Sequence, residues 1–290
     1  MQKQWLIRAK PKKLDLSDCT LADMHFHSKF SEDGLRSIPK ILKRCSKLGV
    51  GVAITDHNTV KGSLAALSYK KEALVIPGVE LTAKEGVHLL AYTYTKGDLM
   101  DLDRTCIQPF RKKNPMVLDV SVCDLLDRLH KLNCITGAPH PYFGLVGICT
   151  AGLKQTYVKK LDVVEVLNRY SFKKWNNKAY RWALESGKGL VGGSDGHTLF
   201  DLGKALTGVE SQVGLQGFLE AIRKRKSFVV GTESGLLDKA FLTVEKEARI
   251  LTRSKGFTVT KGQVRLNYAH LKSKLRTLVE QRRRKKQLFM

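Results

Sequence analysis

Short apolar runs alternate with longer amphipathic stretches from Cys19 to about Gly231, and this alternation restricts the fold more than any other feature. The short runs have the length and β-branched content of strands. In the stretches between them, apolar residues recur three or four positions apart, as on one face of a helix. Strands that alternate with helices of roughly ten to fifteen residues are typical of βαβ units and a mainly parallel sheet. About seven such units favour an α/β fold with a closed or nearly closed βα barrel.

Three segments fall outside this alternation. Residues 1–18 are a basic lead-in to a barrel predicted over residues 19–235. The polar stretch from Lys96 to Asp119 contains two prolines and is predicted to be a surface excursion. Residues 236–290 hold fifteen Lys or Arg against four acidic residues, which predicts a short basic C-terminal extension. Its helical pattern fits a solvated terminal helix as well as it fits a contact with nucleic acid or a membrane surface.

The charge balance is unusual for a chain whose composition is otherwise that of a globular protein. Lys and Arg number 51 against 27 Asp and Glu, a net charge of +24 in 290 residues. Such an imbalance favours a polyanionic partner over a neutral metabolite. No stretch reaches the roughly 18 consecutive apolar residues that a membrane span needs. The six scattered cysteines form no CxxC pair and are expected to be reduced thiols. We therefore expect a cytoplasmic protein without a membrane span, and its oligomeric state stays open.

Histidines and carboxylates gather where the predicted strands end. Six of the eight histidines lie at or just after such ends, and the alternation of the first strand sends Asp23, His25 and His27 to one face. In a βα barrel the carboxyl ends of all strands meet at one face, so residues far apart in the sequence can share a site. The candidate metal ligands are His25, His27, Asp33, His57, Glu80, His88, His140, Asp195 and His197.

Imidazole and carboxylate ligands without a nearby cysteine suit zinc, manganese or iron and disfavour a closed structural zinc site. Nine candidates exceed what one ion uses, but they suffice for two or three divalent ions bridged by carboxylates. Such a centre ionises a bound water near neutral pH and clamps phosphate oxygens. The pattern therefore favours a centre that activates water beside a phosphate group.

Six segments resemble, in order, the motifs of the polymerase-and-histidinol-phosphatase (PHP) superfamily: ADMHFHSKFSEDG, VAITDHNTVKG, VIPGVELTAKEGVHLLAY, APHP, VEVLN and GGSDGHTLFDLG. The resemblance spans residues 20 to about 231. It implies a distorted (βα)7, TIM-like barrel with a trinuclear metal centre that hydrolyses phosphate esters. It also implies how the ligands divide: His25, His27, Glu80 and Asp195 on one ion, Glu80, His88 and His140 on a second, and Asp33, His57 and His197 on a third.

Two carboxylates and one amide are candidates for supporting roles. Asp56 and Asp23 would each orient an imidazole through its second ring nitrogen, or would be plain carboxylates at strand ends. Asn168 resembles a family position near the site that is not a metal ligand.

Three residues in loops that face the site are candidates for binding substrate phosphate. They are Lys29, Ser31 and Lys84, and the simpler interpretation of each is surface exposure. Only about fifty residues separate His88 from His140, so little helical cap is expected over the site.

The favoured function is that of a metal-dependent phosphoesterase acting on nucleic acid or nucleotides, as an exonuclease or a nucleotide phosphatase. A histidinol-phosphate-type phosphatase of small esters is one alternative. A scaffold that binds nucleic acid through its basic tail is an alternative of another class. The tryptophan-containing helix from Lys173 to Trp182 predicts either a stacking surface for bases or, as its spacing favours, a half-buried helix.

Overall fold

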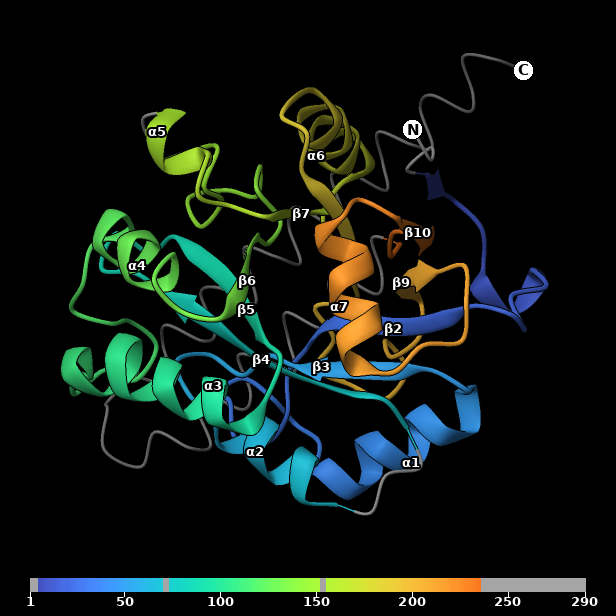
Figure 1. The fold of residues 1–290 in the computed structure, drawn as a ribbon, viewed down its shortest axis with the longest axis horizontal. Coiled ribbons are helices and arrows are strands. Elements are labelled where there is room, and N and C mark those ends of the chain that lie inside the picture. The colour runs from blue at the N-terminus through green and yellow to red at the C-terminus, as the bar shows by residue number, and fades with distance from the viewer. Residues whose placement is uncertain (1–4, 70–72, 152–154, 236–290) are drawn as a thin grey trace, which may run out of the picture. The chain divides into compact units, whose positions relative to one another are not determined.

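A computed structural model describes residues 5–69, 73–151 and 155–235. At its centre is a ten-stranded sheet in the order β1-β10-β9-β2-β3-β4-β5-β6-β7-β8 (Figure 1). The strands are β1 (Leu6–Ile7), β2 (Thr20–Phe26), β3 (Gly51–Ile54), β4 (Val75–Thr82), β5 (His88–Thr93), β6 (Cys134–Ala138), β7 (Val163–Asn168), β8 (Gly189–Gly193), β9 (Ala205–Val209) and β10 (Ser227–Gly231). The α-helices are α1 (Ile38–Leu48), α2 (Lys61–Ser68), α3 (Lys96–Leu102), α4 (Val122–Leu129), α5 (Gln155–Val158), α6 (Lys173–Glu185) and α7 (Leu215–Arg223).

The sheet mixes parallel and antiparallel pairs, which corrects the expectation of a mainly parallel sheet. Strands β2, β3 and β4 are parallel, as are β6, β7 and β8, but β5 is antiparallel to both of its neighbours and β9 is antiparallel to β2 and β10. The reason for the reversal at β5 is the short connection between β4 and β5. Ala83 and Val87 are joined by a hydrogen bond of 2.9 Å across a tight turn, which leaves no room for a crossover helix.

The sheet curls so that β8, the last strand in its order, lies beside β2. Phe26 and Gly196 form an isolated parallel bridge just beyond β8. The backbone N–H of Ser194 donates to Asp23 Oδ1 at 2.8 Å, and that of Gly192 donates to Thr207 Oγ1 at 2.8 Å. The coarse prediction of an α/β fold with a barrel-like sheet is therefore confirmed.

Helix α1 illustrates how the sequence pattern fixes the packing. Ile38, Ile41 and Cys45 recur at helical spacing and are buried in one cluster with the apolar side chains of β3. The helix ends at Gly49, whose φ of +65° lies in the left-handed region that glycine adopts at little cost. Figure 1 shows α1, α2 and α3 along one side of the sheet. In a second cluster, Phe218 of α7 packs with apolar residues of β2, β5 and β7.

The segment from Lys96 to Asp119 is not a surface excursion, because its first half is helical and packs on the core. Thr95 caps α3 by accepting from the backbone N–H of Asp98 at 3.0 Å. The helix continues into a π-helical turn (Asp103–Ile107) and a 3-10 turn (Gln108–Phe110). Leu99, Leu102 and Cys106 are buried. Their helical spacing decides the structure despite the polar residues around them.

Part of the predicted lead-in belongs to the sheet, since β1 pairs in parallel with β10. Just after β1, Arg8 Nε donates to Glu233 Oε1 at 3.1 Å and so ties the two ends of the described chain together. These residues belong to a compact unit over Met1–Thr243. The predicted basic extension, residues 236–290, lies outside the described residues. Cys45, Cys106 and Cys134 are buried, and all six cysteines are free. Over the described ranges, no helix is both long and apolar enough to cross a membrane.

Candidate metal centre

The nine predicted ligands come together at one end of the sheet. His25 and His27 lie at the end of β2, and His57, His140 and Asp195 follow β3, β6 and β8. Glu80 lies near the end of β4. Because β5 runs antiparallel to β4, its first residue, His88, arrives at the same end. All nine are buried except His88 and Asp195, which are partly exposed.

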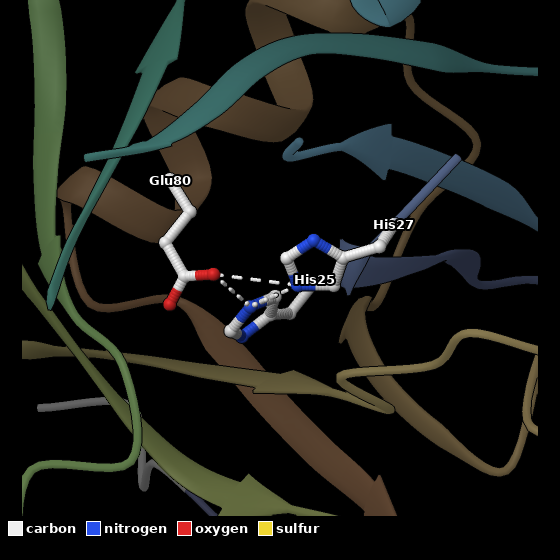
Figure 2. A group of neighbouring side chains, drawn as sticks. All are labelled: His25, His27 and Glu80. Atoms are coloured by element: carbon white, nitrogen blue, oxygen red, sulfur yellow. Dashed lines mark hydrogen bonds and ion pairs between the residues drawn. The ribbon is translucent and has the colours of Figure 1, made fainter. Parts of the chain in front are cut away.

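The first group of side chains surrounds one point from several sides. Figure 2 shows His25, His27 and Glu80 pointing toward one another. The Nε2 atoms of the two histidines are 3.2 Å apart, and Glu80 Oε2 lies 3.2 Å from the first and 3.3 Å from the second. Asp195 Oδ1 lies 3.3 Å from His27 Nε2. The structure thus brings together the four residues that the resemblance assigns to one ion.

The other carboxylate oxygen of Glu80 faces a second group. Its Oε1 lies 2.9 Å from His88 Nδ1 and 3.3 Å from His140 Nε2. His57 also reaches Glu80, because its Nδ1 lies 3.3 Å from Oε2.

A third group gathers around Asp33. Its Oδ2 lies 2.7 Å from His197 Nε2 and 3.8 Å from His57 Nε2. His57 therefore lies between Glu80 and the third group, with one ring nitrogen turned toward each. The three-residue sets with metal-binding geometry are His25/His27/Glu80, His27/Asp33/His197 and His57/Glu80/His88.

The donor atoms of these groups fit divalent cations. In each set, the ring nitrogens and carboxylate oxygens lie within 4.8 Å of one another. Buried polar atoms of this kind need a hydrogen-bond partner or a cation. His27 Nδ1 and His140 Nδ1 are buried and make no hydrogen bond. A set of imidazoles and carboxylates without thiolate suits zinc, manganese or iron.

Burial and opposite charges strongly perturb the acid–base properties of the groups. Burial works against the charged form of His25, but Glu80, Asp195 and Glu165 together raise its pKa well above the ordinary value. Burial also disfavours the charged form of His27, but the nearby carboxylates, with Asp33 the strongest, raise its pKa to about 9. Burial would raise the pKa of Glu80, but the surrounding histidines hold it well below the ordinary value. Burial lowers the pKa of His57 to about 3. Cations that bind here must displace protons from His25 and His27, which makes the affinity of the site for cations pH-dependent.

Glu165, on β7, is a site residue that sequence reasoning missed. Its Oε1 lies 3.0 Å from His25 Nδ1, while Oε2 accepts from the backbone N–H of His140 at 2.7 Å and from Asn168 Nδ2 at 2.9 Å. The carboxylate thus fixes the ring of one candidate ligand and the backbone of another. The signal was present, since a buried strand of apolar residues carries a single charge at this position.

Asp23 and Asp56 bind the backbone and a serine rather than a ring. Asp56 accepts from the backbone N–H of Ser28 at 2.6 Å and from its hydroxyl at 2.7 Å. Asp23 accepts from the backbone N–H groups of Ser194 and Gly203. These bonds fit the second alternative, that of carboxylates at strand ends that orient no imidazole. A short polar side chain beside a strand end finds backbone donors first.

Ser31 and Asn168 lie within the site and hold its carboxylates. The Ser31 hydroxyl donates to Asp33 Oδ1 at 2.7 Å and accepts from the backbone N–H of His57 at 3.3 Å. Asn168 Nδ2 donates to Asp195 Oδ2 at 3.3 Å as well as to Glu165. Both side chains bridge residues of the candidate centre.

The two lysines predicted to face the site are both exposed. Lys29 follows β2, and its Nζ lies 5.4 Å from the centre of the Phe30 ring. Lys84 lines a separate cavity of about 460 Å³ together with Phe110 and Arg128. The structure does not bring Lys84 into the groups described above.

The backbone of the site is strained at two candidate ligands. His140 has a φ of 28° and Asp195 a φ of 51°, which are uncommon for residues with a side chain. Such strain persists where surrounding contacts overdetermine it, typically at functional sites. The backbone also packs closely at Gly193, where an added Cβ atom would lie 2.3 Å from the Cβ of His25.

The interval from His88 to His140 holds β5, α3, α4 and β6. Buried side chains of α3 and α4 in this interval belong to one core cluster.

The chain is similar to known proteins over most of its barrel. An uncharacterized protein, MJ1587, of Methanocaldococcus jannaschii is 29% identical over 160 residues, which cover 51% of this chain and 82% of that protein. A two-domain protein from Bacteroides vulgatus, described as containing a predicted PHP-like metal-dependent phosphoesterase, has a TM-score of 0.57 at 19% identity, with 85% of this chain and 74% of that chain covered. The lesion-specific endonuclease EndoQ of Pyrococcus furiosus has a TM-score of 0.59 at 15% identity, with 84% and 73% covered.

The family matches agree with the resemblance seen in the motifs. A family described as PHP-associated matches residues 173–227. The PHP domain family matches residues 23–199, a range that contains all nine candidate ligands. The chain belongs to the PHP domain family.

Proposed function

We propose that the protein is a metal-dependent phosphoesterase that hydrolyses phosphate ester bonds in nucleic acid or nucleotides. The observation that carries this proposal is the convergence of six histidines and three carboxylates from seven chain segments on one end of the sheet. A merely structural cluster would not need so many buried imidazoles with ring nitrogens facing one another. Membership of the PHP domain family supports the same activity.

The residues of this chain would divide the work as the three groups suggest. His25, His27 and Asp195 would hold one ion, His88 and His140 a second, and Asp33, His57 and His197 a third, with Glu80 shared between the first two. Bound divalent ions would supply Lewis acidity for the phosphate oxygens and activate a water for attack.

Neighbouring side chains would keep the ligands in place. Glu165 holds the His25 ring through Nδ1, which would leave the Nε2 lone pair free to bind a cation. Asn168 would steady Asp195, and Ser31 would steady Asp33. Lys29 would meet the charge of substrate phosphate from the exposed loop after β2.

Two observations favour nucleic acid or nucleotides over other phosphate esters. The net charge of +24 attracts polyanions. EndoQ, whose fold is similar, is described as a lesion-specific endonuclease. The metal ligands themselves do not distinguish a phosphomonoester from a phosphodiester.

The activity can be tested with the full chain and manganese on a generic phosphoester. The double variant His25→Ala, His27→Ala should lose hydrolysis by at least about a hundredfold, since both rings belong to one metal group. His130→Ala is the matched control, because His130 is exposed at the end of α4. Hydrolysis that survives the double change in a folded protein would overturn the proposed mechanism.

Substrate choice is tested by comparing a 5′-phosphorylated oligonucleotide, a nucleoside monophosphate and histidinol phosphate. Preference for histidinol phosphate would move the protein to the small-ester alternative. Deletion of residues 271–290 tests the basic tail. If the tail binds nucleic acid, the deletion should weaken oligonucleotide binding and flatten its salt dependence while sparing small esters.

A further inference from the structure

Three aromatic side chains form a row that starts at the candidate metal centre. Phe143 packs on the ring of the candidate ligand His140, with 5.9 Å between ring centres. Trp175 lies 5.4 Å from Phe143, and Phe172 lies 4.9 Å from Trp175, both edge to face. We call Phe143, Trp175 and Phe172 the aromatic ridge. It joins the loop after β6 to the start of α6.

The ridge is not part of the apolar core. None of its three residues belongs to a core cluster of the described chain, whereas Trp182, two turns along the same helix, packs against two such clusters. Phe143 is 38% exposed, Phe172 is 41% exposed and Trp175 is half-buried. Large rings at this exposure present apolar surface to the solvent.

The surroundings of the ridge are positively charged. Lys173, Lys174 and Lys178 are exposed on the first half of α6, and the only acidic residue of that helix is Glu185 at its far end. Lys174 Nζ lies 5.7 Å from the centre of the Trp175 ring. Within the described ranges these three lysines form no ion pair with a carboxylate. Their charge is thus available to phosphate groups.

Aromatic faces interleaved with lysines are the arrangement that binds a single strand of nucleic acid. Bases stack on the rings whatever their identity, while the lysines follow the phosphate backbone. A duplex would not fit, because its base faces are already covered by neighbouring bases. An apolar peptide would leave the lysines without partners.

We propose that the aromatic ridge is a base-stacking subsite that holds a single-stranded segment of nucleic acid beside the scissile phosphate. This proposal rests on the proposed phosphoesterase function and names its substrate class. A strand that stacks on Phe172 and Trp175 reaches the metal centre through Phe143, which contacts His140 directly. Only the nucleotides next to the cleaved bond need to be unpaired.

The first test is binding of a short 5′-phosphorylated oligothymidylate to the full chain in the absence of metal. Stacking on Trp175 should quench its fluorescence, and Trp175→Ala should raise the Kd about 5- to 150-fold, since one stacked base contributes roughly 1–3 kcal/mol. Trp175→Phe should retain most of the affinity while losing the quench. Phe172→Ala, at an exposed position, provides a second variant that folding defects do not confound. Tyr69→Ala is the control, because Tyr69 is 46% exposed at the end of α2.

The second test separates this subsite from the activity itself. Hydrolysis of glycerol 2-phosphate, which has no aromatic ring to stack, should be the same in Trp175→Ala and wild type, while KM for the oligonucleotide rises. Replacing Lys173, Lys174 and Lys178 by glutamine should reduce the salt slope of single-strand binding by about 2. If wild type hydrolyses neither substrate, the proposed function fails, whereas the binding test still decides the subsite. An unchanged Kd in Trp175→Ala, or equal affinity for duplex, would overturn the subsite proposal.

Discussion

Replacement of Glu165 by glutamine tests whether this carboxylate positions the candidate metal ligands. Glu165 accepts three hydrogen bonds, from the His25 ring, the His140 backbone and the Asn168 amide, at 3.0, 2.7 and 2.9 Å. Glutamine has only one oxygen to accept them. If that oxygen faces His140, the new NH₂ group faces His25 Nδ1, which must then accept, and the ring proton moves to Nε2.

The displaced proton is the source of the expected effect. His25 Nε2 is the atom that lies 3.2 Å from both Glu80 Oε2 and His27 Nε2, where a cation would be held. A proton there removes the lone pair from the first metal group. Partners of this kind change metal affinity by about 10- to 100-fold, which is about 1.4–2.8 kcal/mol.

The assay is a competition titration of manganese against a chelating dye, with the full chain and with Glu165→Gln. Glu210→Gln is the matched control, since Glu210 is exposed just after β9. Circular dichroism and urea unfolding in the presence of EDTA establish that the variant is folded. Affinity within twofold of wild type in a folded Glu165→Gln protein would refute the positioning role.

The other predictions concern stability and are measured by urea unfolding. Gly193→Ala should lower the free energy of unfolding by about 1–3 kcal/mol, because the added Cβ collides with the buried side chain of His25. Gly214→Ala is the control and should be neutral, because an added Cβ there meets no neighbouring atom within 4 Å. Leu99→Ala should lower the free energy of unfolding by about 2–5 kcal/mol, because Leu99 is buried. Met100→Ala, at an exposed neighbouring position, should lower it by less than about 0.5 kcal/mol. Equal losses would mean that α3 does not pack on the core. Burial acts to raise the pKa of Glu233, but hydrogen bonds from its own backbone and from the arginine after β1 hold it below the ordinary value. The stability it contributes is therefore present above pH of about 4.3 and lost as pH falls through the lowered pKa, and Glu233→Gln should abolish this step.

Much of the candidate site could be predicted from the sequence because its signal is local. A histidine or carboxylate at a strand end is visible in a short window, and the barrel rule then places all such ends together. The two-residue period of a strand is enough to place His25 and His27 on one face. His88 reaches the site because β4 and β5 are adjacent strands without a helix between them.

The missed features depend on contacts between segments far apart in the chain. Glu165 is 140 positions from the ring that it holds, and nothing near it in the sequence indicates that partner. Asp56 is next to a candidate ligand, yet its bonds go to Ser28, because the loop after β2 folds back onto it. The helix α3 is hard to recognise in the sequence, because its polar residues obscure the helical spacing of its buried side chains. The aromatic ridge likewise joins a loop and a helix whose rings meet only in the fold.

The central place of Glu80 has a consequence for how the protein takes up metal. Its two oxygens face different groups of histidines, so its one negative charge would be shared between two cations that repel each other. The first cation to bind would fix the orientation of the carboxylate and thereby prepare the neighbouring position, while its own charge would weaken the attraction for the next. Uptake would therefore follow a definite order, with the last ion held most loosely. The concentration of that last ion in the cell, more than the amount of protein, would then set how many molecules are active.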